Sequence, residues 1–258
     1  MFDKSDIFSD AFAHKENCIS RIEARTKIVF VVLALVINLL SPSVYTPLAI
    51  AVFCLATLLA IKIPPRLLLL RLIMPLVMAA VVLVTQLFFY GTTPLFTVPV
   101  LGVVGYEEGL FHGLLIMSRV IGGVSLILFL GMSTPAHRLL MAARWFRLPK
   151  IFVELALLIY RYIFVLIEEA ISIKDAQRVR LGYGNWRRGM RSVGTLGGIL
   201  VLRAYDRAER VFAAMIARGY SGALSVSYAG HFGGKDFIAA AALSTVLVII
   251  YLVGWWRG

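Results

Sequence analysis

Two stretches with similar endings, Asp175-Ala176-Gln177-Arg178-Val179-Arg180-Leu181-Gly182-Tyr183 and Ala214-Met215-Ile216-Ala217-Arg218-Gly219-Tyr220, decide the architecture of this chain. Each follows a helix-like run, and in each the last arginine stands shortly before a glycine and a tyrosine. Both lie in a long basic segment, residues 134–235, which has hydrophobic segments on either side but is too charged to cross a bilayer throughout. This segment is therefore predicted to be the cytoplasmic platform of a membrane protein, where a soluble partner binds.

The composition places the chain in the membrane class. Of its 258 residues, 60% are hydrophobic and 16% are charged, whereas a soluble domain is about half apolar and about a quarter charged. The net charge of +12 favours basic cytoplasmic loops over nucleic-acid binding, because Lys and Arg are retained on the inner face of a membrane. The two cysteines, Cys18 and Cys54, form no disulfide framework or metal quartet, and we expect neither a resident metal nor a cofactor.

Five apolar segments are expected to cross the membrane. The first two, residues 28–40 and 47–61, are each shorter than the about 20 residues that a spanning helix needs. They form either a tight helical hairpin with a turn at residues 41–46 or one long kinked span. The hairpin is favoured because two prolines and two serines lie within residues 41–47. The other predicted spans are residues 67–90, 107–132 and 236–256.

The basic residues predict the orientation of these spans. Neither segment placed outside, residues 41–46 or the Thr-, Pro- and Gly-rich loop 91–105, contains Lys or Arg, whereas every inside segment is basic. Met1–Lys27 has no apolar core of a signal peptide, so it is expected to stay in the cytoplasm. The predicted fold is an all-α integral membrane protein with about five transmembrane helices plus long amphipathic cytoplasmic helices.

The chain is accordingly divided into residues 1–133, 134–235 and 236–258. Within the middle part the pattern predicts a short interfacial helix over residues 136–146 and two long helices, residues 150–180 and 190–218. The second long helix is expected to end at Gly219 as its C-cap glycine. From Arg138 to Arg218 there are 15 Lys/Arg and 6 Asp/Glu, so this region carries most of the net charge.

Residues 151–167 leave two interpretations open. They are apolar enough to span the membrane, but a crossing here would place the basic residues 174–191 outside. A helix that packs along the membrane surface or under the bundle is preferred. Glu154 and Arg161 lie seven residues apart and thus on one face of this helix. We consider them a candidate contact with another membrane subunit.

Arg119 lies in the middle of the fourth predicted span. A charge there costs on the order of 3 kcal/mol on insertion scales, so its side chain should face protein or water. It contacts a partner membrane subunit, forms an internal ion pair, or snorkels to the interface. In the same span four glycines are predicted to let another helix approach closely: Gly109, Gly113, Gly122 and Gly123.

Arg180 and Arg218 also have two interpretations. As cations at helix C-termini they suit the helix dipole, either solvated or bound to lipid headgroups. Alternatively, each protrudes among apolar neighbours into a groove of a soluble partner and pairs with a carboxylate there. The occurrence of both arginines at the ends of two long helices, each followed by Gly and Tyr, favours the groove.

The sequence resembles a known family over essentially its whole length: the transmembrane (T) components of energy-coupling factor transporters, of the CbiQ type. The family has a signature triplet similar to Ala-Arg-Gly at the end of each of two coupling helices. Ala217-Arg218-Gly219 matches it in full, and Val179-Arg180-Leu181 keeps only the arginine, with Arg178 as the alternative register. The other similar stretches are Glu23-Ala24-Arg25-Thr26-Lys27 (Asp-Pro-Arg-Thr-Lys in the family), Phe152-Val153-Glu154-Leu155, Tyr160-Arg161-Tyr162 and Glu168-Glu169-Ala170.

The resemblance implies a subunit that catalyses no reaction itself. Its coupling helices dock into grooves of two ABC-type ATPases, which are CbiO-like, and the motif arginines engage acidic residues there. Closure of the ATPases is passed to a separate substrate-binding membrane subunit, which is CbiM-like in cobalt systems and often has a small CbiN-like companion. Cobalt is implied by the resemblance alone, since nickel importers use nearly the same T component and vitamin importers a related one.

Two other classes of function have less support in the sequence. An intramembrane enzyme needs convergent acid, base or metal groups, but the four histidines are scattered over different segments. A lone secondary carrier would show inverted repeats, and five spans do not divide into two. The sequence has no Gly-x-x-x-x-Gly-Lys-Ser/Thr phosphate-binding loop, so any energy for transport comes from another chain.

Overall fold

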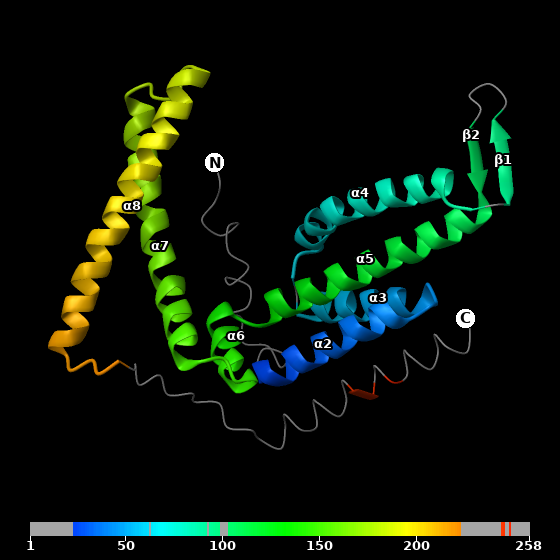
Figure 1. Cartoon of the computed structure of the whole chain (residues 1–258), viewed down its shortest axis with the longest axis horizontal. Coiled ribbons are helices and arrows are strands. Elements are labelled where there is room, and N and C mark those ends of the chain that lie inside the picture. The colour runs from blue at the N-terminus through cyan, green and yellow to red at the C-terminus, as the bar shows by residue number, and fades with distance from the viewer. Residues whose placement is uncertain are drawn as a thin grey trace. The chain divides into compact units, whose positions relative to one another are not determined.

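The computed structural model describes residues 23–222, except 62, 92 and 99–102, together with residues 244, 245 and 248. The chain divides into two compact units, which are described separately: Met1–Leu139 with Gly230–Gly258, and Leu140–Ala229. The described residues are helical except for one β-hairpin and the connecting turns (Figure 1). Residues 1–22 and most of the last predicted span, 236–256, lie outside the described residues.

In the first unit, the described residues include the helices α2 (Ala24–Leu40), α3 (Tyr45–Ala60), α4 (Pro65–Phe89) and α5 (Glu107–Ser133). The longest of them, α5, packs against each of the other three (Figure 1). The core lies where α2, α3 and α5 meet. Its side chains include Phe30, Ala34, Ile50, Cys54, Leu58, Leu126, Phe129 and Met132.

The predicted hairpin of the first two apolar segments is confirmed, because α2 and α3 are separate helices joined by residues 41–44. Ser41 leaves the helical conformation, with φ −65° and ψ 126°, and thus ends α2. The Tyr45 amide donates to the Ser43 hydroxyl at 3.3 Å, which supports the first turn of α3. Both helices begin slightly earlier than the apolar runs, since α2 starts at Ala24 and α3 at Tyr45.

Within the described part of the chain, α4 and α5 are long and apolar enough to cross a membrane, by length and composition. They correspond to the predicted spans 67–90 and 107–132. Helix α3 is apolar but shorter. Pro65 occupies the first turn of α4, where its missing N–H costs nothing, and Pro75 lies inside the helix without ending it.

The prediction of an irregular loop over residues 91–105 is wrong. This segment contains an antiparallel pair of strands, β1 (Pro94–Val98) and β2 (Val103–Tyr106), with an irregularity in register between Pro94 and Phe96. Phe96-Thr97-Val98 and Val103-Val104 are aromatic and β-branched residues, which favour strands. The Thr, Pro and Gly content of the segment had pointed to a loop.

Close approach at the glycines of α5 is confirmed for three of the four. A Cβ at Gly109 would clash with the carbonyl oxygens of Gln86 and Tyr90 on α4, and one at Gly113 would lie 3.0 Å from the Leu83 Cα. At Gly122, a Cβ would lie 2.6 Å from Asn38 Oδ1 on α2. Only ordinary contacts surround Gly123. Small residues thus bring α5 against α4 on one side and α2 on another.

Two cations fasten α2 to α5. The fully buried Lys27 Nζ donates to the carbonyl of Ser133 at 2.9 Å and to Thr134 Oγ1 at 3.1 Å, at the C-terminal end of α5. In the opposite direction, Arg119 Nη2 donates to the carbonyl of Ser41 at 2.8 Å, at the C-terminal end of α2. Neither helix has a basic residue in its own last turn, so each end receives a cation from the other helix.

The second unit contains α7 (Lys150–Val179) and α8 (Trp186–Ala217), preceded by α6 (Ala136–Ala143) and a short 3₁₀ helix, η1 (Arg144–Phe146). The helices predicted at 136–146 and 150–180 are confirmed. The prediction that the second long helix begins near Met190 is wrong by four residues. Asn185 is extended, with φ −145° and ψ 153°, and its carbonyl accepts the Gly189 amide at 2.8 Å, so α8 begins at Trp186.

We predict that Lys27→Met destabilises the first unit. The substitution leaves the carbonyl of Ser133 and the hydroxyl of Thr134 without the Lys27 donor at a buried position, which typically costs about 1–3 kcal/mol. Thermal unfolding of the purified chain in detergent should show a lower midpoint for Lys27→Met than for Arg66→Met, whose arginine is exposed at the start of α4. Equal midpoints would contradict a structural role for the Lys27 bonds.

Candidate functional site

The two motif arginines occupy the same position at the ends of α7 and α8. At the end of α7, the Gly182 amide donates to the carbonyl of Gln177 at 2.9 Å, and the Leu181 amide donates to that of Arg178 at 3.1 Å. At the end of α8, the same two bonds join Tyr220 to Met215 at 3.0 Å and Gly219 to Ile216 at 2.9 Å. Arg180 and Arg218 are therefore both C-cap residues of one recurring helix-ending motif.

This correspondence bears on the register of the first motif. Arg180 matches Arg218 in its place relative to the two terminating hydrogen bonds, whereas Arg178 lies within the last turn of α7. The motif requires a left-handed residue after the C-cap, and Gly219 fills this position with φ +81°. Leu181 fills it at the end of α7 with φ +55°. A side chain in this conformation costs roughly 1–2 kcal/mol, so the first helix end is strained and the second is not.

All six residues of the two predicted triplets are exposed: Val179, Arg180, Leu181, Ala217, Arg218 and Gly219. The apolar neighbours of Arg180 are highly accessible, since 85% of Val179 and 72% of Leu181 is exposed. At the other end, Ala217 and Gly219 surround Arg218 with little side-chain bulk. Each helix end thus presents one arginine and a small or apolar surface around it.

Helices α7 and α8 run antiparallel, so the two arginines lie at opposite ends of the pair (Figure 1). Gln177, near the end of α7, bonds to Ser192 near the start of α8. Further along, Glu169 accepts Arg207 Nη2 at 2.7 Å and lies 3.8 Å from Arg203 Nη1. The 32 residues of α8 rise by about 1.5 Å each, which separates the two helix ends by about 48 Å.

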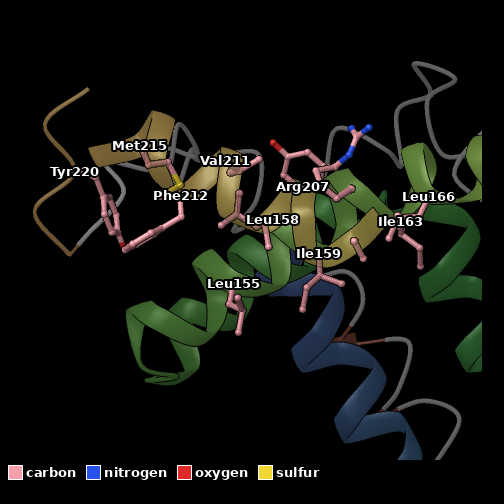
Figure 2. A pocket seen from close by; sticks show the side chains of 13 residues that line it. Leu155, Leu158, Ile159, Ile163, Leu166, Arg207, Val211, Phe212, Met215 and Tyr220 are labelled. Atoms are coloured by element: carbon pink, nitrogen blue, oxygen red, sulfur yellow. The ribbon is translucent and has the colours of Figure 1, made fainter. Parts of the chain in front are cut away.

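The two helices also enclose an apolar pocket of about 630 Å³ (Figure 2). The first half of α7 supplies Leu155 and Ile159, and the second half of α8 supplies Phe212 and Met215. Tyr220, two residues beyond Arg218, also lines the pocket. The pocket therefore reaches the helix end that carries the second arginine. Its lining is mostly apolar, with Arg207 as the charged side chain.

The structure places the three other predicted site residues in different surroundings. Arg119 is engaged inside the first unit by its bond to the Ser41 carbonyl, which is an internal interaction but not an ion pair. Glu154 is buried and Arg161 is exposed, with the Arg161 Cζ 6.0 Å from the centroid of the Tyr162 ring. Their role as contacts with a membrane subunit stays a prediction.

Sequence reasoning missed two interactions. Lys27 was noted as part of a motif, but its partners Ser133 and Thr134 are more than a hundred residues away. Glu169, also within a motif, joins α7 to α8 through Arg207. For Glu169 the available signal was an acidic residue with no basic residue three or four positions away, whereas Lys27 follows Glu23 by four residues and carried no such signal. Among the described residues, no group of three His, Cys, Asp or Glu side chains could hold a metal ion.

We predict opposite effects of exchanging the left-handed residues of the two helix ends. Leu181→Gly should relieve the strain at the end of α7, and Gly219→Leu should introduce it at the end of α8, each by about 1 kcal/mol. Hydrogen–deuterium exchange of the terminal amides should therefore slow by about fivefold at Gly182 and accelerate by about fivefold at Tyr220. Unchanged exchange in Leu181→Gly would mean that Leu181 is not held in the left-handed conformation.

Comparison with known proteins supports the resemblance drawn from the motifs. The family model described as CbiQ, cobalt transport protein, matches residues 15–228. An uncharacterised protein of Methanocaldococcus jannaschii is 32% identical over 93% of this chain and 90% of its own length. A putative fused cobalt transport protein CbiMQ of Methanocorpusculum labreanum is 35% identical over 80% of this chain, which spans 35% of that protein.

A third relative, the cobalt transport protein CbiQ of Rhodobacter capsulatus, is 42% identical over 97 residues, which are 38% of this chain and 40% of that protein. The family model covers both arginine triplets and all helices of the described structure. The chain therefore belongs to the CbiQ family of cobalt transport proteins, the T components of energy-coupling factor transporters, and is a transporter component rather than an enzyme.

Proposed function

We propose that this chain is the coupling subunit of an energy-coupling factor importer for cobalt. In this role it passes the ATP-driven motion of two ATPase subunits to a separate substrate-binding membrane subunit. The observation that carries the proposal is the pair of exposed arginines at equivalent helix ends. Arg180 and Arg218 terminate α7 and α8 in the same way, and α8, which is about 48 Å long, lies between them. Two separate docking points suit two ATPase subunits, one at each end.

Each helix end has the properties expected of a segment that docks into a groove of a partner protein. The terminating bonds use backbone N–H groups for the last carbonyls, so the arginine side chain is not required to cap its own helix. An arginine keeps its charge when it is partly buried and offers a planar set of donors to a carboxylate. Around Arg180, the exposed Val179 and Leu181 supply apolar surface that an interface would remove from water.

Membrane placement is part of the proposal. We propose five spans in the cell membrane, namely α2, α3, α4, α5 and residues 236–256, with the N-terminus in the cytoplasm. The apolar length of α4 and α5 supports this arrangement, as does the absence of Lys and Arg from residues 91–105 between them. Helix α7 is placed along the membrane surface in this proposal, because a crossing there would put the basic residues 174–191 outside.

The partner that binds the substrate is proposed to be CbiM-like. The relative from Methanocorpusculum labreanum bears the name of a fused CbiMQ protein, and a fusion joins chains that work together. Cobalt is supported by the descriptions of the family and of its relatives. A small CbiN-like subunit is the proposed companion of this partner. Nickel as the ion and a vitamin as the cargo are the alternatives that the partner's identity would distinguish. Glu154 and Arg161 are the candidate residues for this contact.

The experiment that tests the function is purification of the complex from native membranes in mild detergent, through a tag on this chain. We expect two ABC-type ATPase subunits and a metal-binding membrane subunit to copurify, and mass spectrometry would identify them. The identity of the membrane subunit would then establish the ion. Recovery of the chain without any ATPase, even in the presence of nucleotide, would overturn the coupling function.

We further predict that Arg218→Glu abolishes ATPase docking and cobalt uptake, because it places a second negative charge opposite the acidic residue of the groove. Loss of one partner of such a pair costs about 2–5 kcal/mol, so binding should weaken by at least about 30-fold. Membrane insertion should be normal, since the substitution lies in the cytoplasmic part. ATPase binding by the purified complex and uptake of labelled Co²⁺ by cells check the two effects.

The matched pair for the other helix end is Arg180→Ala and Arg178→Ala. Both residues are exposed and two positions apart, but only Arg180 occupies the C-cap position equivalent to that of Arg218. Arg180→Ala is expected to impair docking and Arg178→Ala to leave it nearly unchanged. The reverse result would shift the first motif to Arg178, and normal uptake by Arg218→Glu cells would remove the basis of the proposal.

A further inference from the structure

The turn that follows Arg180 is closed by a ring of side-chain hydrogen bonds. Tyr183 Oη donates to Gln177 Oε1 at 2.8 Å, and Gln177 Nε2 donates to the carbonyl of Ser192 at 3.0 Å. Ser192 Oγ then donates to the carbonyl of Gly182 at 2.9 Å. The ring joins the last turn of α7, the turn itself and the second turn of α8. All of these bonds are partly buried, so water competes with them only in part.

Gly182 shows how closely the ring is packed. A Cβ at this position would lie 2.7 Å from Ser192 Oγ and 2.9 Å from the carbonyl oxygen of Gln177. The residue is therefore a glycine because of the close approach of α8 and not because of its own backbone angles. The same carbonyl of Gln177 accepts the Gly182 amide in the motif that ends α7. The side-chain ring and the helix-ending motif thus share residues.

The turn that follows Arg218, at the end of α8, differs from the turn that follows Arg180. Within residues 23–222, the turn after Arg218 has the backbone bonds of the motif but no recorded side-chain hydrogen bond, and a Cβ at Gly219 would meet nothing within 4 Å. The α7 end, in contrast, holds a leucine in a left-handed conformation. A strained residue persists where surrounding structure over-determines it, and the ring supplies such a constraint around Leu181.

We propose that Gln177, Tyr183 and Ser192 are positioning residues that hold Arg180 in its docking orientation. The proposal rests on the coupling function proposed above. Arg180 lies between Gln177, which anchors the ring, and the strained Leu181. If Leu181 adopted a right-handed conformation instead, α7 would continue past Arg180, and the arginine would lie on the side of the helix and not at its end. Fixing this geometry in advance lowers the entropy lost when the arginine enters the groove of the ATPase.

The test is a double-mutant cycle on binding of the copurified ATPase subunits to the full chain in lipid nanodiscs. Tyr183→Phe removes only the hydroxyl that closes the ring, and Ser192→Ala breaks the ring at a second point. We expect each to weaken ATPase binding by about five- to tenfold. Combined with Arg180→Ala, either should change binding by less than twofold, whereas combined with Arg218→Ala each should keep its full effect. A merely destabilising change would not distinguish the two backgrounds.

Two controls make the outcome unambiguous. Tyr205→Phe removes the hydroxyl of an exposed tyrosine on α8 and should leave binding unchanged. Hydrogen–deuterium exchange at the Gly182 amide should accelerate by about fivefold in Tyr183→Phe, which reports opening of the turn without any partner.

Equal effects of Tyr183→Phe in the Arg180→Ala and Arg218→Ala backgrounds would overturn the positioning role, as would unchanged exchange at Gly182 or normal binding by both ring variants. Normal binding by Arg180→Ala alone would also overturn it, because there would be no docking arginine at the α7 end to position. If Arg180→Ala and Arg218→Ala both bind the ATPase normally, the coupling function itself fails. The two failures are therefore distinguishable.

Discussion

The carbonyl groups at the C-terminal end of a helix need donors, and the way this need is met explains both units of the chain. In the first unit, a cation from another helix meets it: Lys27 at the end of α5 and Arg119 at the end of α2. Both bonds are long-range in sequence, so each also fixes how two helices pack. The glycines of α5 allow the backbones to approach closely enough for these bonds to form.

In the second unit, the same need is met locally. In helices α7 and α8, the last carbonyls accept hydrogen bonds from the backbone amides that follow the last turn. The side chains of Arg180 and Arg218 are therefore not needed for capping. The same residue type therefore has different consequences in the two units. An arginine that points into the bundle, such as Arg119, holds helices together, whereas an arginine at an exposed C-cap is open to solvent and, in the proposed function, enters a partner. This difference is why the docking surfaces of the proposed function lie at helix ends.

Much of this architecture could be predicted from the sequence, because it depends on local signals. Apolar length, proline and glycine placed the helices, and the motif arginines were found at helix ends. The strands at 94–106 were missed because Thr, Pro and Gly hid a β-branched pattern, and the start of α8 was missed because Gly189, a poor helix former, lies in its first turn. The bonds of Lys27 and the ring around Ser192 depend on the approach of distant segments, which no local signal encodes.

The left-handed leucine connects local strain with the proposed coupling. A glycine at position 181 would end α7 with less strain, as Gly219 does for α8, yet leucine adds exposed apolar surface beside Arg180. Such surface is useful only if something covers it, and in the proposed function that is the groove of an ATPase. The conformational cost of roughly 1–2 kcal/mol is then offset by burial of the side chain in the complex. A residue that is unfavourable for the isolated helix end is in this way favourable for docking, and the hydrogen-bonded ring keeps the strained turn in place until the partner binds.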